Sequence, residues 1–326
     1  MKGIRFLFIL FFLVSCTQKD AHPYTFYYWK THLSLNPAEK KALKEATAPY
    51  LFTRFFDVDK VDGKFQPIAV ITKDKSFETD KQIIPVVFIT NQTFLNIKAD
   101  EIKFLAESIY RLVRKKVEDY HLKTGNEIQI DCDWTAGTRD DYFKFLKVLK
   151  ETSGEEVTCT LRLHQVKDKN LTGIPPVGKM YLMCYSTSSP LEASDKNSIL
   201  DVNTLKSYLS KLEDYPVKKI EVALPLYSWG IVTNHLGKHK LINALSKKDL
   251  ENKNFKKISE NEIVIIKDGF YFGNFLNKGF KIKVEEITDD QLEDVVRLLD
   301  KKIRHFNIIY YQLDSKFVKD QNFNMF

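Results

Sequence analysis

Short stretches of alternating apolar and polar residues recur along the chain. In residues 157–164 one face would carry Val, Cys, Leu and Leu, and the other Thr, Thr, Arg and His. Residues 309–314 repeat the pattern, with Tyr310, Gln312 and Asp314 expected on the polar face. Strands of an open parallel sheet are usually apolar on both faces. The pattern therefore favours a closed barrel whose interior becomes polar towards one end.

The strand patterns alternate with longer segments of helical periodicity, which predicts a parallel sheet with crossover helices. Strands are expected at 25–30, 51–56, 83–89, 127–133, 156–164, 179–185, 219–226 and 306–313. Helices are expected at 37–46, 99–120, 139–152, 202–212 and 289–305. We predict an α/β fold over residues 24–326, a single (β/α)8 TIM-like barrel. An open doubly wound sheet is the alternative, but no Gly-rich phosphate loop follows the first strand.

Three segments depart from an ideal barrel. Residues 60–81 indicate a loop with a short strand at 67–72, and residues 167–178, rich in Gly and Pro, leave room for a vestigial helix only. Residues 230–287 contain three further strand patterns, which predict a hairpin-rich insertion after strand seven. Such an insertion would emerge at the carboxyl-terminal face, where barrel enzymes build their sites.

The first residues indicate export. Lys2 and Arg5 precede the apolar run 6–14, which is too short to span a bilayer comfortably and ends in Leu-Val-Ser-Cys16. This ending resembles the bacterial lipobox. It predicts a signal peptide at 1–15, a lipidated Cys16, and a short tether to residue 23. With Thr17 after the cysteine, bacterial sorting rules imply an outer-membrane lipoprotein facing the periplasm or the surface.

Charge and cysteine usage exclude several classes of protein. The formal net charge is +7, but lysine and acidic residues are interspersed, so nucleic acid is not an expected partner. Cys132, Cys159 and Cys184 fall on the apolar faces of expected strands and fit small core residues, although one disulfide stays possible. No metal-ligand spacing occurs. We expect neither metal nor cofactor, and a monomer.

The most informative segment is 127–135, Glu-Ile-Gln-Ile-Asp-Cys-Asp-Trp-Thr. Asp131 and Asp133 would point inward at the end of a strand, where polar side chains are costly unless they are paired or used. The segment resembles the Asp-x-Asp-Trp-Glu end of the fourth barrel strand in chitinase-like family 18 glycoside hydrolases. That resemblance implies a catalytic acid at the position held here by Thr135. Residues 183–186, Met-Cys-Tyr-Ser, similarly resemble the Met-x-Tyr-Asp of those hydrolases, with Ser186 in place of the Asp.

Carboxylates and aromatic residues at the predicted strand ends predict a sugar site. Asp131 and Asp133 are the candidate catalytic pair, with Asp57 or Asp314 as another possible partner of Asp133. The expected substrate-binding residues are Trp29, Asp57, Trp134, His164, Tyr185, Tyr227, Trp229, Gln312 and Asp314. Some of these residues also have a purely structural interpretation. Asp131 would suit an ion pair with Arg162 or Arg54, and His164, Trp134 and Trp229 would suit packing.

Three functions remain open at this level. An envelope lipoprotein acting on a glycan would hydrolyse it with a rearranged acid–base pair, since a threonine hydroxyl cannot protonate a leaving group at neutral pH. A catalytically inactive lipoprotein would bind glycan or peptidoglycan through the aromatic residues. A purely structural lipoprotein would need neither inward carboxylates nor an aromatic rim.

Overall fold

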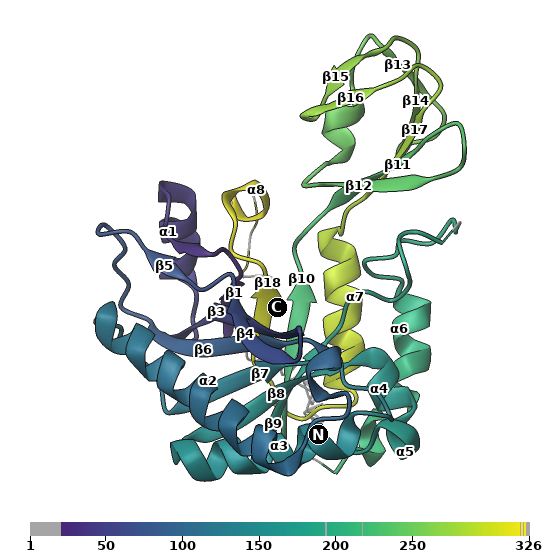
Figure 1. Cartoon of the computed structure of the whole chain (residues 1–326). Helices are drawn as coiled ribbons and strands as arrows, with labels where there is room; N and C mark the ends of the chain where they lie inside the picture. Colours follow the sequence, from purple (N-terminus) through teal and green to yellow (C-terminus); the bar gives the residue numbers. More distant parts are fainter. Residues whose placement is uncertain (1–20, 193, 217, 320, 322, 324–326) are drawn as a thin grey trace, which may run out of the picture.

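Eight parallel strands close into a barrel, as predicted (Figure 1). The computed structural model describes residues 21–192, 194–216, 218–319, 321 and 323. The barrel strands are β1 (Tyr24–Tyr28), β3 (Tyr50–Val61), β6 (Gln82–Ile89), β7 (Glu127–Asp131), β8 (Glu156–Arg162), β9 (Lys179–Met183), β10 (Lys219–Pro225) and β18 (Ile308–Tyr311). Each pairs with its neighbour, and β1 pairs with both β18 and β3, which closes the circle. The open-sheet alternative is therefore wrong.

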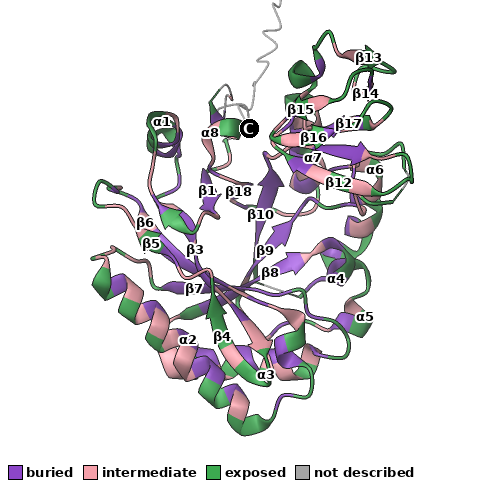
Figure 2. Ribbon diagram, turned by 45° about the horizontal axis from the view of Figure 1, so that its top comes forward, coloured by how far each residue is buried: buried purple, intermediate pink, exposed green. Residues whose placement is uncertain are grey.

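Helices surround the barrel and bury their apolar faces against it (Figure 2). They are α1 (Pro37–Glu45), α2 (Ala99–Asp119), α3 (Arg139–Ser153), α6 (Val202–Tyr208) with the 3-10 turn η2 (Leu209–Asp214), and α7 (Asp289–Asp300). Helix α1 begins where the Asn36 side chain accepts hydrogen bonds from the amides of Ala38 and Glu39. Cys132, Cys159 and Cys184 are buried free thiols in the apolar core outside the barrel. Cys159 lies in β8, and the other two directly follow β7 and β9.

Strand β8 ends earlier than the alternation predicted. The Gln165 side chain accepts a hydrogen bond from the amide of Arg162 at 2.8 Å, and helix α4 (Leu163–Lys167) begins directly afterwards. The helical start removes His164 from the strand and exposes its side chain. A second short helix, α5 (Lys169–Thr172), follows where one vestigial helix was expected.

The segment after β3 is a hairpin. Asp62 and Gly63 both have positive φ angles, 49° and 74°, and this tight turn sends β4 (Lys64–Ile68) back along β3. The short strand predicted at 67–72 is therefore misplaced, because the turn comes earlier. A further short strand, β5 (Thr72–Lys73), pairs with β2 (His32–Leu33).

The insertion after β10 is a five-stranded antiparallel sheet that stands above the barrel mouth (Figure 1). Its strands are β11 (Trp229–Thr233), β12 (His239–Asn243), β13 (Phe255–Lys257), β14 (Glu262–Ile265) and β17 (Lys281–Glu285), with the hairpin β15 (Gly269–Tyr271) and β16 (Asn274–Leu276) beside them. The insertion has an apolar core of its own, separate from that of the barrel. Three short elements complete the fold: η1 (Asn91–Phe94), η3 (Lys247–Leu250) and α8 (Ser315–Val318).

The expected signal peptide and Cys16 lie outside the described residues. Within the described part of the chain, no helix has the length and apolar character needed to cross a bilayer.

Candidate functional site

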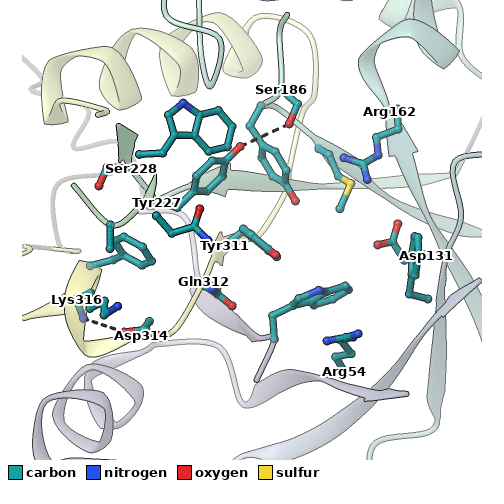
Figure 3. A pocket seen from close by; sticks show the side chains of 18 of the residues that line it. Arg54, Asp131, Arg162, Ser186, Tyr227, Ser228, Tyr311, Gln312, Asp314 and Lys316 are labelled. Carbon is teal, nitrogen blue, oxygen red and sulfur yellow. Dashed lines mark hydrogen bonds between the residues drawn. The ribbon is translucent and has the colours of Figure 1, made fainter. Parts of the chain in front are cut away.

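A cavity of about 600 Å³ opens at the carboxyl ends of the barrel strands (Figure 3). Residues of β3, β6, β7, β8, β9 and β18 converge there, together with residues that follow β1, β7, β9, β10 and β18. Trp229, Asn243 and Ala244 of the insertion complete one side. The structure brings together these residues predicted from the sequence: Trp29, Asp57, Asp131, Asp133, Tyr185, Tyr227, Trp229, Gln312 and Asp314. It leaves out two, Trp134 and His164.

Asp131 lies deep in the cavity, 3% exposed, at the end of β7. The Thr160 hydroxyl of the neighbouring strand donates a hydrogen bond to its carboxylate at 2.6 Å. Burial raises the pKa of Asp131, and the nearby Arg162 guanidinium only partly opposes that rise. Figure 3 shows the carboxylate facing the cavity, on the same side as Arg162. Asp131 is the carboxyl group of the cavity whose pKa is set mainly by burial, whereas the other three form ion pairs.

Asp133, two residues further on, is about half exposed and is held by Arg162 from the end of β8. The Nε atom donates to one carboxylate oxygen, and Nη2 donates to the other at 3.3 Å. Burial alone would lower the pKa of Arg162, but the charges of Asp131 and Asp133 outweigh burial and raise it. Arg162 thus remains charged and occupies both oxygens of Asp133.

The two other carboxylates of the cavity are also engaged. Arg54 grips Asp57 through Nε at 2.6 Å and through Nη2. Asp314 accepts a hydrogen bond from the amide of Lys316 at 3.0 Å, and Lys30 lies 3.5 Å from its other oxygen. Every Asp that lines the cavity therefore has a hydrogen-bond donor, and three of the four are held by a cation.

Aromatic rings form a continuous wall along the cavity. From one end to the other, Trp29 lies 5.6 Å from Tyr311, Tyr311 stacks on Tyr185 at 5.6 Å, Tyr185 meets Tyr227 at 6.0 Å, and Tyr227 meets Trp229 at 5.2 Å between ring centroids. We call these five residues the aromatic wall. Flat apolar ring faces beside polar groups are the surface on which the C–H faces of sugars stack.

Two polar atoms of the cavity have no hydrogen-bond partner among the described residues, the Tyr185 hydroxyl and the Gln312 side-chain oxygen. Tyr185 is 5% exposed, and burial raises its pKa well above the ordinary value, so its hydroxyl keeps its proton. Figure 3 shows Gln312 beside Tyr311, among the residues that line the cavity. A buried donor and a buried acceptor that are left unpaired are costly, so both side chains would gain from a hydrogen-bond partner in the cavity that they line.

A second cavity of about 400 Å³ adjoins the first. It contains Thr135 and His164, and it shares Asp133, Arg162 and Tyr185 with the main cavity. His164 thus remains near the site, although it comes from helix α4 rather than from a strand.

Trp134 has a different place from the one predicted. It is fully buried, its indole N–H donates to the carbonyl of Thr172 at 2.9 Å, and its ring stacks on Tyr142 at 5.1 Å. Because its side chain alternates with those of Asp131 and Asp133, it turns away from the cavity and packs against α3. Trp134 is a packing residue.

The alternation in the last strand was assigned to the wrong face. Tyr310 packs outside the barrel against Tyr24 and Phe323, whereas Tyr311 lines the cavity. Strand β18 ends at Tyr311, so Gln312 leaves the alternation and reaches the cavity as well. Sequence reasoning also missed Lys316 and Phe317, which follow the strand and line the cavity, because the only signal was their position after it.

The closed parallel barrel is similar in fold to solved chitinases and to a spore cortex-lytic enzyme. The spore cortex-lytic enzyme SleL of Bacillus cereus matches 92% of this chain over 72% of its own, with a TM-score of 0.56 and 16% identity. A chitinase of Chromobacterium violaceum matches 91% of this chain over 96% of its own, with a TM-score of 0.54 and 13% identity. A chitinase of Bacteroides thetaiotaomicron has a TM-score of 0.52 and 10% identity, covering 92% and 97%.

At these identities the likeness establishes the fold. No family model matches the chain, and no curated protein matches it.

Proposed function

We propose that this chain is a cell-envelope lipoprotein whose barrel binds a glycan in the main cavity without cleaving it as the chitinase-like hydrolases do. One observation carries the proposal. Each Asp of the cavity is already held by a hydrogen-bond donor, and Thr135 stands where the resemblance places the catalytic acid. The aromatic wall lines the same cavity, and the buried Tyr185 hydroxyl and Gln312 side-chain oxygen have no partner among the described residues.

The chemistry of the cavity fits a neutral, hydroxylated ligand. Three of its four carboxylates are balanced by a cation, so little net charge remains to select a charged group. The aromatic wall supplies stacking surfaces, Tyr185 a hydrogen-bond donor and Gln312 an acceptor. With chitinases and a cortex-lytic enzyme among the similar structures, the proposed ligand is a glycan containing N-acetylglucosamine, such as chitin fragments or peptidoglycan strands.

Hydrolysis is the second candidate, and Asp131 is the observation in its favour. Burial raises its pKa, which is the direction of shift that a general acid requires. Asp133 lies beside it as a second carboxylate, but Arg162 occupies both of that residue's oxygens. This arrangement favours binding over turnover.

The envelope location rests on the first residues alone. The apolar run ending in Leu-Val-Ser-Cys16 supports a lipid anchor, and the described chain starts only a few residues later. A monomer joined to the membrane through Cys16 would present its cavity to a glycan of the envelope or of its surroundings.

The experiment is titration calorimetry of the protein with N-acetylglucosamine hexamer and with soluble peptidoglycan fragments, alongside an assay for newly formed reducing ends. Tyr185→Phe should weaken binding about tenfold, because it removes the unpaired donor. It should not lower the melting temperature, because that hydroxyl has no hydrogen-bond partner among the described residues.

Tyr215→Phe is the matched control. Tyr215 is also 5% exposed, but it lies outside both cavities and donates to the carbonyl of Gly173. Its substitution should cost stability and leave affinity unchanged. Equal binding by wild type and Tyr185→Phe, or rapid release of reducing ends by wild type, would overturn the proposal.

A further inference from the structure

Glu285 is a buried carboxylate at the junction between the insertion and the barrel. It ends β17 and is 2% exposed. One oxygen accepts hydrogen bonds from the indole Nε1 of Trp229 at 2.9 Å, from the amide of Ser198 at 3.0 Å and from the Ser198 hydroxyl. The ammonium of Lys283 lies 3.0 Å from the other oxygen. A carboxylate so deeply buried is tolerated because it is fully paired.

These partners belong to three separate parts of the chain. Trp229 begins β11 and faces Glu285 directly in the antiparallel register of β11 and β17. Ser198 belongs to the segment between β9 and α6. Lys283 also donates to the carbonyls of Ser194 and Lys196 in that segment, at 2.8 and 2.9 Å. Glu285 therefore joins the insertion to the barrel at the same place where it holds an aromatic side chain.

The aromatic side chain that it holds is one end of the aromatic wall. Trp229 lines the main cavity and contacts Tyr227, and its indole N–H is directed to Glu285. Without that acceptor the ring would lose the contact that fixes its orientation, since an indole N–H seeks a partner when it is partly buried. At the other end of the wall, the Arg54 guanidinium lies 5.7 Å from the ring of Trp29. Both tryptophans of the wall are thus held by charged groups.

We propose that Glu285 is a positioning residue, which sets the orientation of Trp229 and through it the affinity of the main cavity for its glycan. The inference rests on the proposed function and adds a residue of the insertion that does not itself line the main cavity. Pre-orientation of an aromatic side chain lowers the cost of ordering it when a ligand binds. Glu285 therefore affects affinity without contacting the ligand.

The test is a double-mutant cycle of Glu285→Gln and Trp229→Phe, with N-acetylglucosamine hexamer as the probe in titration calorimetry. The amide of Glu285→Gln has one acceptor oxygen and directs an NH2 group at donors. It should weaken binding about tenfold. Trp229→Phe has no indole N–H, so adding Glu285→Gln to it should cause little further loss. This non-additivity is the expected result.

Glu221→Gln is the matched control. Glu221 is also buried, at 3% exposed, and it is held by Lys219 at 2.7 Å near the opposite end of the barrel. Its substitution should lower the melting temperature and leave affinity alone. If Glu285→Gln does not fold, Ser198→Ala replaces it in the same cycle. It removes the hydroxyl donor to Glu285 and leaves the carboxylate paired with the backbone amide of residue 198 and the Trp229 indole.

The outcomes separate the two proposals. If Glu285→Gln changes only the melting temperature while Trp229→Phe weakens binding, the positioning role is wrong and the glycan site stands. Fully additive losses would also overturn the positioning role. If the wild type binds neither N-acetylglucosamine hexamer nor soluble peptidoglycan fragments, the proposed function itself fails.

Discussion

The guanidinium of Arg162 holds the carboxylate of Asp133 through two of its nitrogens, between the two cavities of the barrel mouth. Both residues come from adjacent strand ends, β7 and β8, which explains why residues 29 positions apart meet. This ion pair limits the acid–base chemistry that is open to Asp133. A carboxylate with both oxygens engaged by a guanidinium is poorly placed to exchange a proton with a ligand.

Asp133→Asn should weaken glycan binding by roughly 0.5–3 kcal/mol, because it removes a charge-assisted pair and frees Arg162 to move between the cavities. Titration calorimetry measures the change. Asp140→Asn is the control, since Arg139 holds Asp140 at 2.7 Å in a similar fork on the surface, away from the cavity. A loss of turnover by about 10²–10⁴-fold, with little change in affinity, would instead identify Asp133 as an acid or base.

Asp131 should make stability depend on pH. Its pKa is raised in the folded protein, so its favourable contribution is complete below the ordinary value of about 3.9 and is lost as pH rises through the raised pKa. Asp131→Asn cannot ionise. Its melting temperature, compared with that of the wild type, should therefore increase progressively as pH rises through the raised pKa of Asp131.

Thermal unfolding at a series of pH values gives this comparison, with Asp133→Asn as the exposed counterpart. Asp131→Asn should change stability more than Asp133→Asn, because Asp131 is buried and Asp133 is about half exposed. A difference that runs in the opposite direction with pH would show that Arg162 outweighs burial at Asp131.

Thr135→Glu should create hydrolytic activity towards N-acetylglucosamine hexamer. It places a carboxyl group where the resemblance to family 18 hydrolases locates the acid, and general acid catalysis contributes about 10²–10⁴-fold. Thr135→Gln, similar in size but unable to donate a carboxyl proton, should stay inactive. Reducing-end release measures both. Equal turnover by the wild type and Thr135→Glu would mean that another residue already supplies the proton.

Replacement of residues 230–287 by a short linker should leave a folded barrel that binds glycan more weakly. The insertion has its own core, so its removal spares the barrel core, but it takes away Asn243 and Ala244 from the cavity and Glu285 from Trp229. Circular dichroism with thermal unfolding tests folding, and calorimetry tests binding. Non-cooperative unfolding of the shortened chain would contradict the expected independence.

Cys16→Ala should release the protein from the membrane fraction or block its processing, because no thioether to lipid can form without the cysteine sulfur. Fractionation and immunoblotting of cells expressing each form measure this. Attachment that persists unchanged in the variant would rule out the lipid anchor.

The barrel was predictable because its strands combine an apolar outer face with a polar inner face. Thr158 and Thr160 face inward to Glu127 and Asp131, as the alternation predicted, while Cys159 packs outside. Errors arose where strands end. The alternation of apolar and polar residues does not show that Gln165 caps a new helix after Arg162. Nor does it show that β18 ends before Gln312.

The pairing of charges could be foreseen only in part. Arg162 and Arg54 were recognised as possible partners for Asp131, yet they bind Asp133 and Asp57. Which of two neighbouring carboxylates an arginine reaches depends on strand register and on how far each side chain stands from the rim. The linear sequence contains neither. The role of Glu285 depends on the pairing of β17 with β11, which no sequence motif indicates.

The three tryptophans of the chain occupy distinct environments, Trp134 in the sealed core and Trp29 and Trp229 at opposite ends of the cavity wall. The protein therefore contains an optical reporter of its own. Ligand entry should change the emission of Trp29 and Trp229 while Trp134 supplies a constant, blue-shifted background. Two single replacements, at positions 29 and 229, would then show which end of the wall a ligand reaches first in a stopped-flow trace.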